Sequence, residues 1–326
     1  MILPHGNCLD QLKTLEANSI DSVVTDPPYG LKFMGKKWDY DVPSVEIWRE
    51  VLRVLKPGGH VLSFGGTRTY HRMVVNIEDS GFEIRDQVMW IYGSGFPKSH
   101  NGEHGGTALK PANEPICLAR KPIEGTVAKN FEKYGVGGLN IDASRIAAGI
   151  DHAKNCARTF QSGIWAKSGE GKAQITTEAN PQGRWPANVL FDEDAAAVLD
   201  EQSGMLKSGS LKPYVAVNSS KTSMAYDGQK TWTGEANKGG ASRFFYVAKA
   251  SKRERGEGNS HPTVKPIKLM QYLIKLVTPQ DGTVLDPFMG SGSTGVAAKS
   301  LGFQFVGIEM NEEYLEIAKG RISNGD

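Results

Sequence analysis

Strand-like and helix-like segments alternate at both ends of this 326-residue chain, and that alternation constrains the fold more than any other feature. It predicts parallel strands, which must be covered by helices on both faces. The last 45 residues hold too few elements to bury such a sheet alone, so they must pack against the N-terminal part. The segment 121–240 is polar, rich in Gly, Ser and Lys, and weakly periodic. We therefore expect one α/β domain with a doubly wound, mostly parallel sheet, formed by 1–120 and 241–326 and interrupted by a loop-rich insertion.

The expected elements are located by their periodicity. Strands are predicted at 21–26, 60–66, 87–93, 114–120, 283–288 and 303–309, and regular structure is expected to return at 243–249. A helix is predicted between the first two strands, and the Pro-Gly-Gly segment at 57–59 is expected to end it in a turn. Its apolar face consists of Trp48, Val51, Leu52 and Leu55. Two later helices show the same spacing, on Met270, Leu273, Ile274 and Val277 and on Tyr314, Leu315, Ala318 and Ile322.

A glycine-rich loop, Gly290-x-Gly292-x-x-Gly295, lies between a predicted strand and a predicted helix. Glycines at this spacing let the backbone approach a nucleotide, with a helix N-terminus behind it. Glu309 ends the next strand, where a carboxylate can accept hydrogen bonds from both ribose hydroxyls. NAD fits poorly, because too few residues follow the loop and because Asp286-Pro287-Phe288 stands where the strand would run into the first glycine. S-adenosylmethionine, which has ribose hydroxyls but no pyrophosphate, is the alternative ligand.

The segment Asp26-Pro27-Pro28-Tyr29 follows the first predicted strand and is stiff, because two consecutive prolines stop a helix and give no N–H to a sheet. An aromatic exocyclic amine is a poor nucleophile, so a site that methylates it should accept hydrogen bonds from both of its N–H groups. The Asp26 carboxylate and the Pro28 carbonyl are suitable acceptors, and the Tyr29 ring offers a stacking face. A base must leave its duplex to reach such a site, at a cost of roughly a few kcal/mol. Positioning and electrostatics can then suffice for in-line methyl transfer, without covalent catalysis or metal.

Together, D-P-P-Y at 26–29 and D-P-F-x-G-S-G-S-T-G at 286–295 resemble the two signature motifs of amino-group DNA methyltransferases. The catalytic motif precedes the cofactor motif, an order similar to that of the circularly permuted β subgroup of this family. The segments 261–266 (H-P-T-V-K-P) and 6–15 are similar to two further family segments. The resemblance implies a Rossmann-like methyltransferase domain at 1–120 and 241–326, S-adenosylmethionine as methyl donor, no metal requirement and a target-recognition domain at 121–240.

The resemblance also implies roles for individual residues. Asp26, Pro27, Pro28 and Tyr29 are expected to be catalytic. Asp286 is expected near the amino group of the cofactor, and Lys265 near its carboxylate. The other expected cofactor-binding residues are His261, Thr263, Phe288, Gly290, Ser291, Gly292, Ser293, Thr294 and Glu309.

The target amine is expected to be N6 of adenine, because family members that methylate N4 of cytosine more often carry Ser at the place of Asp26. N4-cytosine methylation is the alternative, followed by an RNA or protein amine and by a DNA-binding module without catalysis. Methylation of the C5 ring carbon of cytosine is disfavoured, since that reaction needs a thiolate, typically in a Pro-Cys dipeptide, and the chain has no such dipeptide.

Double-stranded DNA is the expected partner, but a net charge of +2 means that phosphate binding must come from local patches. The candidate contacts are Lys249, Lys252, Arg253, Arg255 and Arg184. A homodimer and a cognate restriction enzyme are further partners that we consider. Three cysteines without a CxxC pair and the lack of a leader or long apolar run favour a cytoplasmic location in a bacterial or phage-encoded system.

Overall fold

The computed structural model describes residues 1–31, 39–95, 99–147, 158–161, 174–177, 182–207, 238–248 and 264–324. The chain divides into two compact units, each of which is described by itself. The first comprises Met1–Ser144, Ala187–Ala196 and Tyr246–Asp326, and the second comprises Arg145–Pro186 and Ala197–Phe245. The segments 121–144 and 187–196, which were expected in the insertion, thus belong to the first unit, where β7 pairs in the main sheet, and 241–245, expected in the catalytic domain, belongs to the second.

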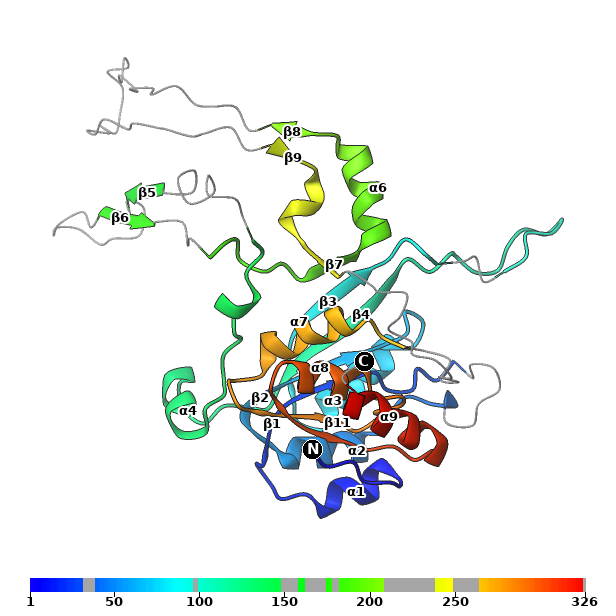
Figure 1. The fold of residues 1–326 in the computed structure, drawn as a ribbon, viewed down its shortest axis with the longest axis vertical. Helices are drawn as coiled ribbons and strands as arrows, with labels where there is room; N and C mark the ends of the chain where they lie inside the picture. The colour runs from blue at the N-terminus through cyan, green and yellow to red at the C-terminus, as the bar shows by residue number, and fades with distance from the viewer. Residues whose placement is uncertain are drawn as a thin grey trace. The chain divides into compact units, whose positions relative to one another are not determined.

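The first unit is built on an eight-stranded sheet in the order β10-β7-β3-β4-β2-β1-β11-β12 (Figure 1). These strands are β10 (Tyr246–Ala248), β7 (Val189–Asp192), β3 (Glu83–Ile91), β4 (Asn113–Arg120), β2 (Leu55–Phe64), β1 (Ile20–Thr25), β11 (Thr283–Asp286) and β12 (Gln304–Gly307). Strand β4 runs antiparallel to both of its neighbours, while every other pairing in this sheet is parallel. The predicted mostly parallel α/β sheet is therefore confirmed, with elements from the two ends of the chain adjacent at β1 and β11.

Helices cover the sheet on both faces, as a doubly wound fold requires (Figure 1). Helices α1 (Cys8–Thr14), α2 (Val45–Val54) and α3 (Tyr70–Asp79) pack in one row, and α7 (Ile267–Val277), α8 (Ser293–Ser300) and α9 (Glu312–Asn324) pack in another. Helix α4 (Val127–Tyr134) packs beside β2, and α6 (Glu193–Ser203) follows β7. Helix α7 buries eight of its 11 residues, because it contacts both the sheet and α8. It is thereby a rigid support for the residues that precede it.

The core of the first unit lies between β1, β2 and the row α1–α3. Trp48 and Val51 on α2 are fully buried against Val23 and Val61 of the sheet, so these two members of the predicted apolar face are confirmed. Leu52 is partly buried, and Leu55 begins β2 instead of lying on the helix. Each such aliphatic side chain contributes about 1.5–3 kcal/mol when it leaves water. This packing stabilises the carboxyl end of β1, which leads directly to Asp26.

The expected turn at 57–59 lies inside β2 instead. The strand begins at Leu55, and its pairing with β1 shifts from Ile20↔Leu55 to Ser22↔His60, so extra residues bulge from the ladder. Gly58 adopts a left-handed conformation (φ 83°) within this bulge. The Pro-Gly-Gly segment was a correct sign of irregular backbone, but a bulge accommodates it without ending the strand.

The second unit has two short antiparallel pairs among its described residues. These are β5 (Arg158–Gln161) with β6 (Gln174–Thr177), and β8 (Leu206–Lys207) with β9 (Lys238–Gly239). Within it, Asp200 accepts hydrogen bonds from the backbone N–H and the hydroxyl of Ser242. Across the described parts of the whole chain, no helix is long and apolar enough to cross a membrane.

Candidate active site

The two sequence motifs meet at the carboxyl ends of β1 and β11. The register Val23↔Leu285 places these strand ends side by side, as expected from the sequence. The hydroxyl of Thr25 donates a hydrogen bond of 2.6 Å to Oδ1 of Asp286, so the motifs are joined by a buried contact. In an open parallel sheet, this edge is where ligands bind.

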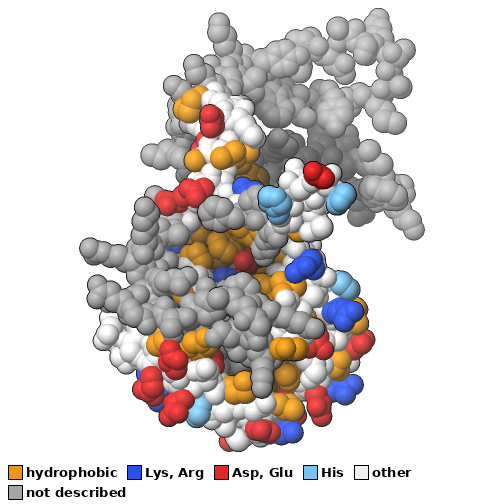
Figure 2. All heavy atoms as spheres, turned by 90° about the vertical axis from the view of Figure 1, so that its right-hand side faces the viewer, with side chains coloured by type: hydrophobic (Ala, Val, Ile, Leu, Met, Phe, Trp, Pro, Cys, Tyr) orange, Lys and Arg blue, Asp and Glu red, His pale blue; other side chains and the backbone are white. Residues whose placement is uncertain are grey.

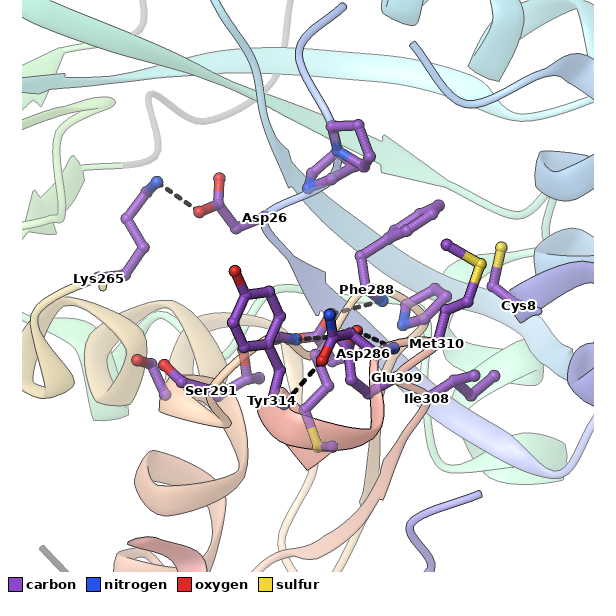
Figure 3. Close-up of a pocket in the computed structure, with 18 of the residues that line it drawn as sticks. Cys8, Asp26, Lys265, Asp286, Phe288, Ser291, Ile308, Glu309, Met310 and Tyr314 are labelled. Atoms are coloured by element: carbon purple, nitrogen blue, oxygen red, sulfur yellow. Dashed lines mark hydrogen bonds and ion pairs between the residues drawn. The ribbon is translucent and has the colours of Figure 1, made fainter. Parts of the chain in front are cut away.

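A cavity of about 510 Å³ opens at this edge and is lined by both motifs. The polar and charged groups around it include Asp26, Tyr29, Glu114, Lys265, Asp286 and Glu309. Its apolar lining includes Phe288, Ile308, Met310 and Tyr314. In Figure 3, Asp26 and Lys265 face each other at one end, while Asp286, Phe288 and Glu309 gather at the other. The cavity is large enough for a ligand of nucleoside size and is mostly apolar with a few polar anchors.

The loop after Asp26 is held in place by Asp39. The buried Asp39 carboxylate accepts three backbone N–H bonds, from Tyr29 (2.7 Å), Gly30 (3.0 Å) and Leu31 (3.2 Å). Gly30 has φ 66°, a left-handed conformation that glycine adopts without strain. The hydroxyl of Thr69 donates to the Tyr29 carbonyl at 2.5 Å. These contacts make the segment 26–31 a preorganised loop.

One ammonium and two carboxylates surround the Tyr29 hydroxyl. Lys265 Nζ lies 2.6 Å from Asp26 Oδ2, 3.2 Å from Glu114 Oε2 and 3.3 Å from the Tyr29 oxygen. The Tyr29 oxygen lies 2.7 Å from Asp26 Oδ1 and 3.1 Å from Glu114 Oε2, and its single proton can be donated to only one of them at a time. Lys265 therefore lies at the Asp26 end of the cavity, and its expected role beside the cofactor carboxylate stays a prediction.

Burial and charge together set the protonation of this cluster. Burial by itself would lower the pKa of the Lys265 ammonium, but the carboxylates of Asp26 and Glu114 outweigh burial and hold that pKa above its ordinary value. Burial, followed by the two neighbouring carboxylates, raises the pKa of the Tyr29 hydroxyl well above its ordinary value. At neutral pH, Lys265 is thus a cation and Tyr29 a neutral hydrogen-bond donor.

At the other end of the cavity, Asp286 is buried and fully hydrogen-bonded. It accepts from the hydroxyls of Thr25 and Thr294, each at 2.6 Å, and from the N–H of Phe288 at 3.1 Å. Burial raises the pKa of Asp286 to about 6, with a smaller contribution from the charge of Asp26, although these hydrogen bonds favour the ionised form. A cationic ligand group beside Asp286 would favour its ionisation.

Glu309 lies two residues after the end of β12 and organises the glycine loop. Its Oε2 accepts from the N–H of Gly290 at 2.8 Å, and its Oε1 accepts from the N–H of Asn311 at 2.7 Å. Burial raises its pKa. Each carboxylate oxygen has a further lone pair, so Glu309 can still accept hydrogen bonds from ligand hydroxyls.

The glycines of the loop serve different purposes. Gly290 lines the cavity, but Gly292 does not. Gly292 has φ 83°, and a Cβ atom there would lie 2.9 Å from Cβ of Ala318 on α9. A Cβ on Gly295 would lie 2.5 Å from Ile322 Cδ1. Gly292 and Gly295 therefore allow close packing of the loop and α8 against α9, while Gly290 permits approach to a ligand.

These residues fit S-adenosylmethionine by the chemistry of their donors and acceptors. The Glu309 carboxylate suits a pair of ribose hydroxyls, and Asp286 suits an amino group with a positive charge. Phe288, Ile308 and Met310 supply apolar surface for a purine ring. Ser291 lines the cavity as well, and its hydroxyl, which accepts from Arg321 on α9, keeps its own proton for donation.

Several predicted residues lie outside the described part of the chain. These are His261, Thr263, Lys249, Lys252, Arg253 and Arg255. Arg184 is described and belongs to the second unit, where its Nη1 donates to the Arg243 carbonyl and its guanidinium lies 4.9 Å from the Phe244 ring centre. On the face in Figure 2, acidic and basic side chains of the coloured residues are interspersed, so these residues form no continuous basic field there.

Glu114 and Asp39 are site residues that the sequence analysis missed. Glu114 is the second residue of β4, and only the pairing of β4 beside β2 brings it to Tyr29. Asp39 has no motif of its own. An acidic residue at the start of an apolar strand, as in Asn113-Glu114-Pro115-Ile116, is a weak signal that could have suggested Glu114.

A family model described as DNA methylase, which covers N6 and N4 methylation, matches residues 20–320. This chain belongs to that family. The DNA methylase is 40% identical over 342 residues to the type II methyltransferase M2.DpnII of Streptococcus pneumoniae, covering 99% of this chain and 89% of that one. It is 25% identical over 331 residues to the DNA adenine methyltransferase YhdJ of Escherichia coli K12, covering 98% and 81%. A shorter match, 40% identical over 91 residues, covers 28% of this chain and 34% of the type II methyltransferase M2.LlaDCHI of Lactococcus lactis subsp. cremoris.

The fold is also found in the protein TTHA0409 of Thermus thermophilus. That structure matches with a TM-score of 0.50 and 16% identity, covering 99% of this chain and 95% of that one. The resemblance found in the sequence and the Rossmann-like fold are thus confirmed. The DNA methylase acts on exocyclic amino groups, and the two chemistries of its family are N6-adenine and N4-cytosine methylation.

Proposed function

We propose that this DNA methylase transfers the methyl group to N6 of an adenine that has left a DNA duplex. One observation carries the proposal above all: Asp26 lines the same cavity as Asp286 and Glu309. A target amine at Asp26 and a cofactor held by Asp286 and Glu309 would lie in the same cavity, as direct transfer of a methyl group between them requires.

Asp26 and Pro28 would activate the amine. The Asp26 carboxylate would accept one N–H of the amine and the Pro28 carbonyl would accept the other, which draws the nitrogen towards tetrahedral geometry and localises its lone pair. Bound S-adenosylmethionine supplies a methyl group on a positively charged sulfur. Asp26 and Pro28 would direct the nitrogen lone pair at that methyl group, with the neutral thioether as leaving group, and one proton would leave the nitrogen for water.

The adenine assignment has two supports. An aspartate at position 26 provides a charged acceptor, which members of this family that act on cytosine N4 more often replace with serine. The relative YhdJ, which is similar over nearly the whole chain, is named as an adenine methyltransferase. N4 of cytosine is the competing target, because its amine presents the same pair of N–H donors.

The second unit is our candidate for target recognition. It is inserted between parts of the catalytic unit and contains an arginine–aromatic group, in which Arg184 and Arg243 lie 4.9 and 4.5 Å from the Phe244 ring centre. Trp185 in the same unit is 65% exposed, and Arg145 lies 5.6 Å from its ring centre. Arginines and exposed aromatic rings are groups that proteins use to contact phosphates and unpaired bases.

A product analysis tests the proposal. The protein is incubated with unmethylated genomic duplex DNA and methyl-labelled S-adenosylmethionine, and the DNA is then hydrolysed to nucleosides. We expect the label in N6-methyladenine. Label only in N4-methylcytosine would overturn the adenine assignment, and transfer to RNA in preference to duplex DNA would overturn the assignment of the substrate.

A further inference from the structure

We propose, on the basis of the proposed function, that Glu114 is a positioning residue that takes the Lys265 ammonium away from Asp26 when a target amine enters. In the described structure, Lys265 Nζ donates to Asp26 Oδ2 at 2.6 Å. The same carboxylate is the proposed acceptor for the target amine. The lysine therefore competes with an N–H of the substrate for the same carboxylate.

Asp26 has no oxygen without a donor in this arrangement. Its Oδ1 accepts from the Tyr29 hydroxyl at 2.7 Å, and its Oδ2 accepts from Lys265. Each oxygen keeps a second lone pair, but the ammonium offsets the negative charge of the carboxylate, so a target amine meets the full charge of Asp26 only if Lys265 turns away. Tyr29 has a second acceptor at 3.1 Å and Lys265 has one at 3.2 Å, and in both cases that acceptor is Glu114 Oε2.

Burial explains why the second acceptor matters. The Lys265 side chain is 8% exposed, whereas those of Asp26 and Glu114 are 23% exposed. An ammonium this deeply buried cannot be left without any ionic partner except at a large cost. Because Glu114 is within hydrogen-bond distance already, Lys265 can release Asp26 by a small rotation and remain paired.

The charges of the cluster favour the reaction as well. Two carboxylates, Asp26 and Glu114, share the one ammonium of Lys265, and the Tyr29 hydroxyl is neutral. The other described titratable groups that face the cluster are Tyr92, Asp39 and Asp286. One excess negative charge is complementary to the positive charge that develops on the amine nitrogen as the new bond forms. Without Glu114, the ammonium would neutralise Asp26.

Three variants of the full-length protein test this inference: Glu114→Gln, Lys265→Met and the double substitution. Single-turnover transfer to unmethylated genomic duplex DNA is measured across pH, and S-adenosylmethionine binding is measured by calorimetry. For Glu114→Gln we expect transfer to fall by at least about tenfold with cofactor affinity unchanged, because the ammonium is then committed to Asp26. For Lys265→Met we expect the acid limb of the rate–pH profile to move to higher pH, because two adjacent carboxylates without an ammonium retain a proton longer.

The double substitution is decisive. If Glu114 acts by holding Lys265, then removal of Lys265 should restore part of the transfer rate lost in Glu114→Gln, since Asp26 is again free of the ammonium. A purely structural role for the two residues gives losses that add. Glu83→Gln is the matched control, because Glu83 pairs with Arg120 at 2.6 Å and does not line the cavity.

The outcomes separate the two proposals. If the wild-type protein transfers methyl to DNA, two results would overturn only the proposed role of Glu114. One is an unchanged transfer rate in Glu114→Gln, and the other is a double variant slower than both single variants. A wild-type protein that forms no methylated nucleoside would overturn the proposed function itself.

Discussion

Lys265 Nζ and Asp26 Oδ2 lie 2.6 Å apart, although the two residues are 239 positions apart in the chain. The contact joins the segment before α7 to the segment after β1. Both segments are held by buried elements, since α7 contacts β1 directly. The ion pair therefore belongs to a rigid edge of the sheet, where proposed catalytic groups are preorganised.

Asp26→Asn should abolish most of the methyl transfer. The amide has the shape of the carboxylate but lacks its charge, so we expect transfer to fall at least about 100-fold. Affinity for S-adenosylmethionine should stay within about twofold, because the cofactor end of the cavity is a separate set of contacts. Single-turnover assays and calorimetry measure the two effects. Transfer at the wild-type rate would show that another group activates the amine.

Gly292→Ala should destabilise the fold rather than the cofactor complex. The new Cβ would lie 2.9 Å from Cβ of Ala318, and φ is 83°. Gly302 is a matched control, because it has φ 81° and nothing within 4 Å of its Cβ position. We expect Gly302→Ala to cost about 1 kcal/mol of unfolding free energy through backbone strain, and Gly292→Ala to cost about 1–3 kcal/mol more through overpacking. If chemical denaturation gives the same loss of unfolding free energy for Gly292→Ala and Gly302→Ala, the close packing of Gly292 against α9 does not constrain the loop.

Asp39→Asn should disturb the loop that carries Tyr29. It weakens three backbone hydrogen bonds at once, so we expect a loss of about 1–3 kcal/mol in unfolding free energy and a fall in turnover of about tenfold or more. Asp41→Asn is the control, because Asp41 is exposed and its carboxylate accepts from the N–H of its own neighbour, Val42, rather than from the Tyr29 loop. If both variants lose the same turnover, Asp39 does not position the site.

Cofactor affinity should depend on the protonation of Asp286. With its pKa raised to about 6 by burial, the carboxyl group is neutral at lower pH and cannot pair with a cationic amino group. Affinity for S-adenosylmethionine should therefore rise as the pH increases from about 5 to 7. Below the pKa of Asp286 the rise should be up to about tenfold for each pH unit, and binding should release a proton. Asp286→Asn should flatten this dependence. Calorimetry in buffers of different ionisation enthalpy checks it, and a wild-type affinity that does not change over this range would contradict it.

The same pKa shift acts on the folding of the cofactor-free protein. A pKa raised from 3.8 to about 6 means that the folded state holds the proton more tightly than the unfolded state does. The stabilising contribution of this group is therefore complete below about pH 3.8 and is lost as the pH rises through about 6. The difference in unfolding free energy between the wild type and Asp286→Asn should fall over that range. A difference that rises with pH would contradict the direction of the shift.

Local patterns were sufficient for most elements of the first unit. The spacing of Trp48 and Val51 predicted α2, because a periodic apolar face reports burial directly. The bulge at Gly58 was not predictable, since the same Pro-Gly-Gly segment is compatible with a turn or with a strand that shifts its register. The antiparallel direction of β4 was also outside the reach of periodicity, which carries no information on strand pairing.

The site residues, like the elements of the fold, were predictable from sequence only where a local motif marks them. The sequence by itself determined which groups are available, because Asp26-Pro27-Pro28-Tyr29, the glycine loop and Glu309 are local motifs whose order identifies the family. Only the tertiary structure decided which groups meet. It paired Lys265 with Asp26 and brought Glu114 to Tyr29, because strand order and helix packing set distances that sequence separation leaves open. Charges interact through space, so their partners depend on the fold.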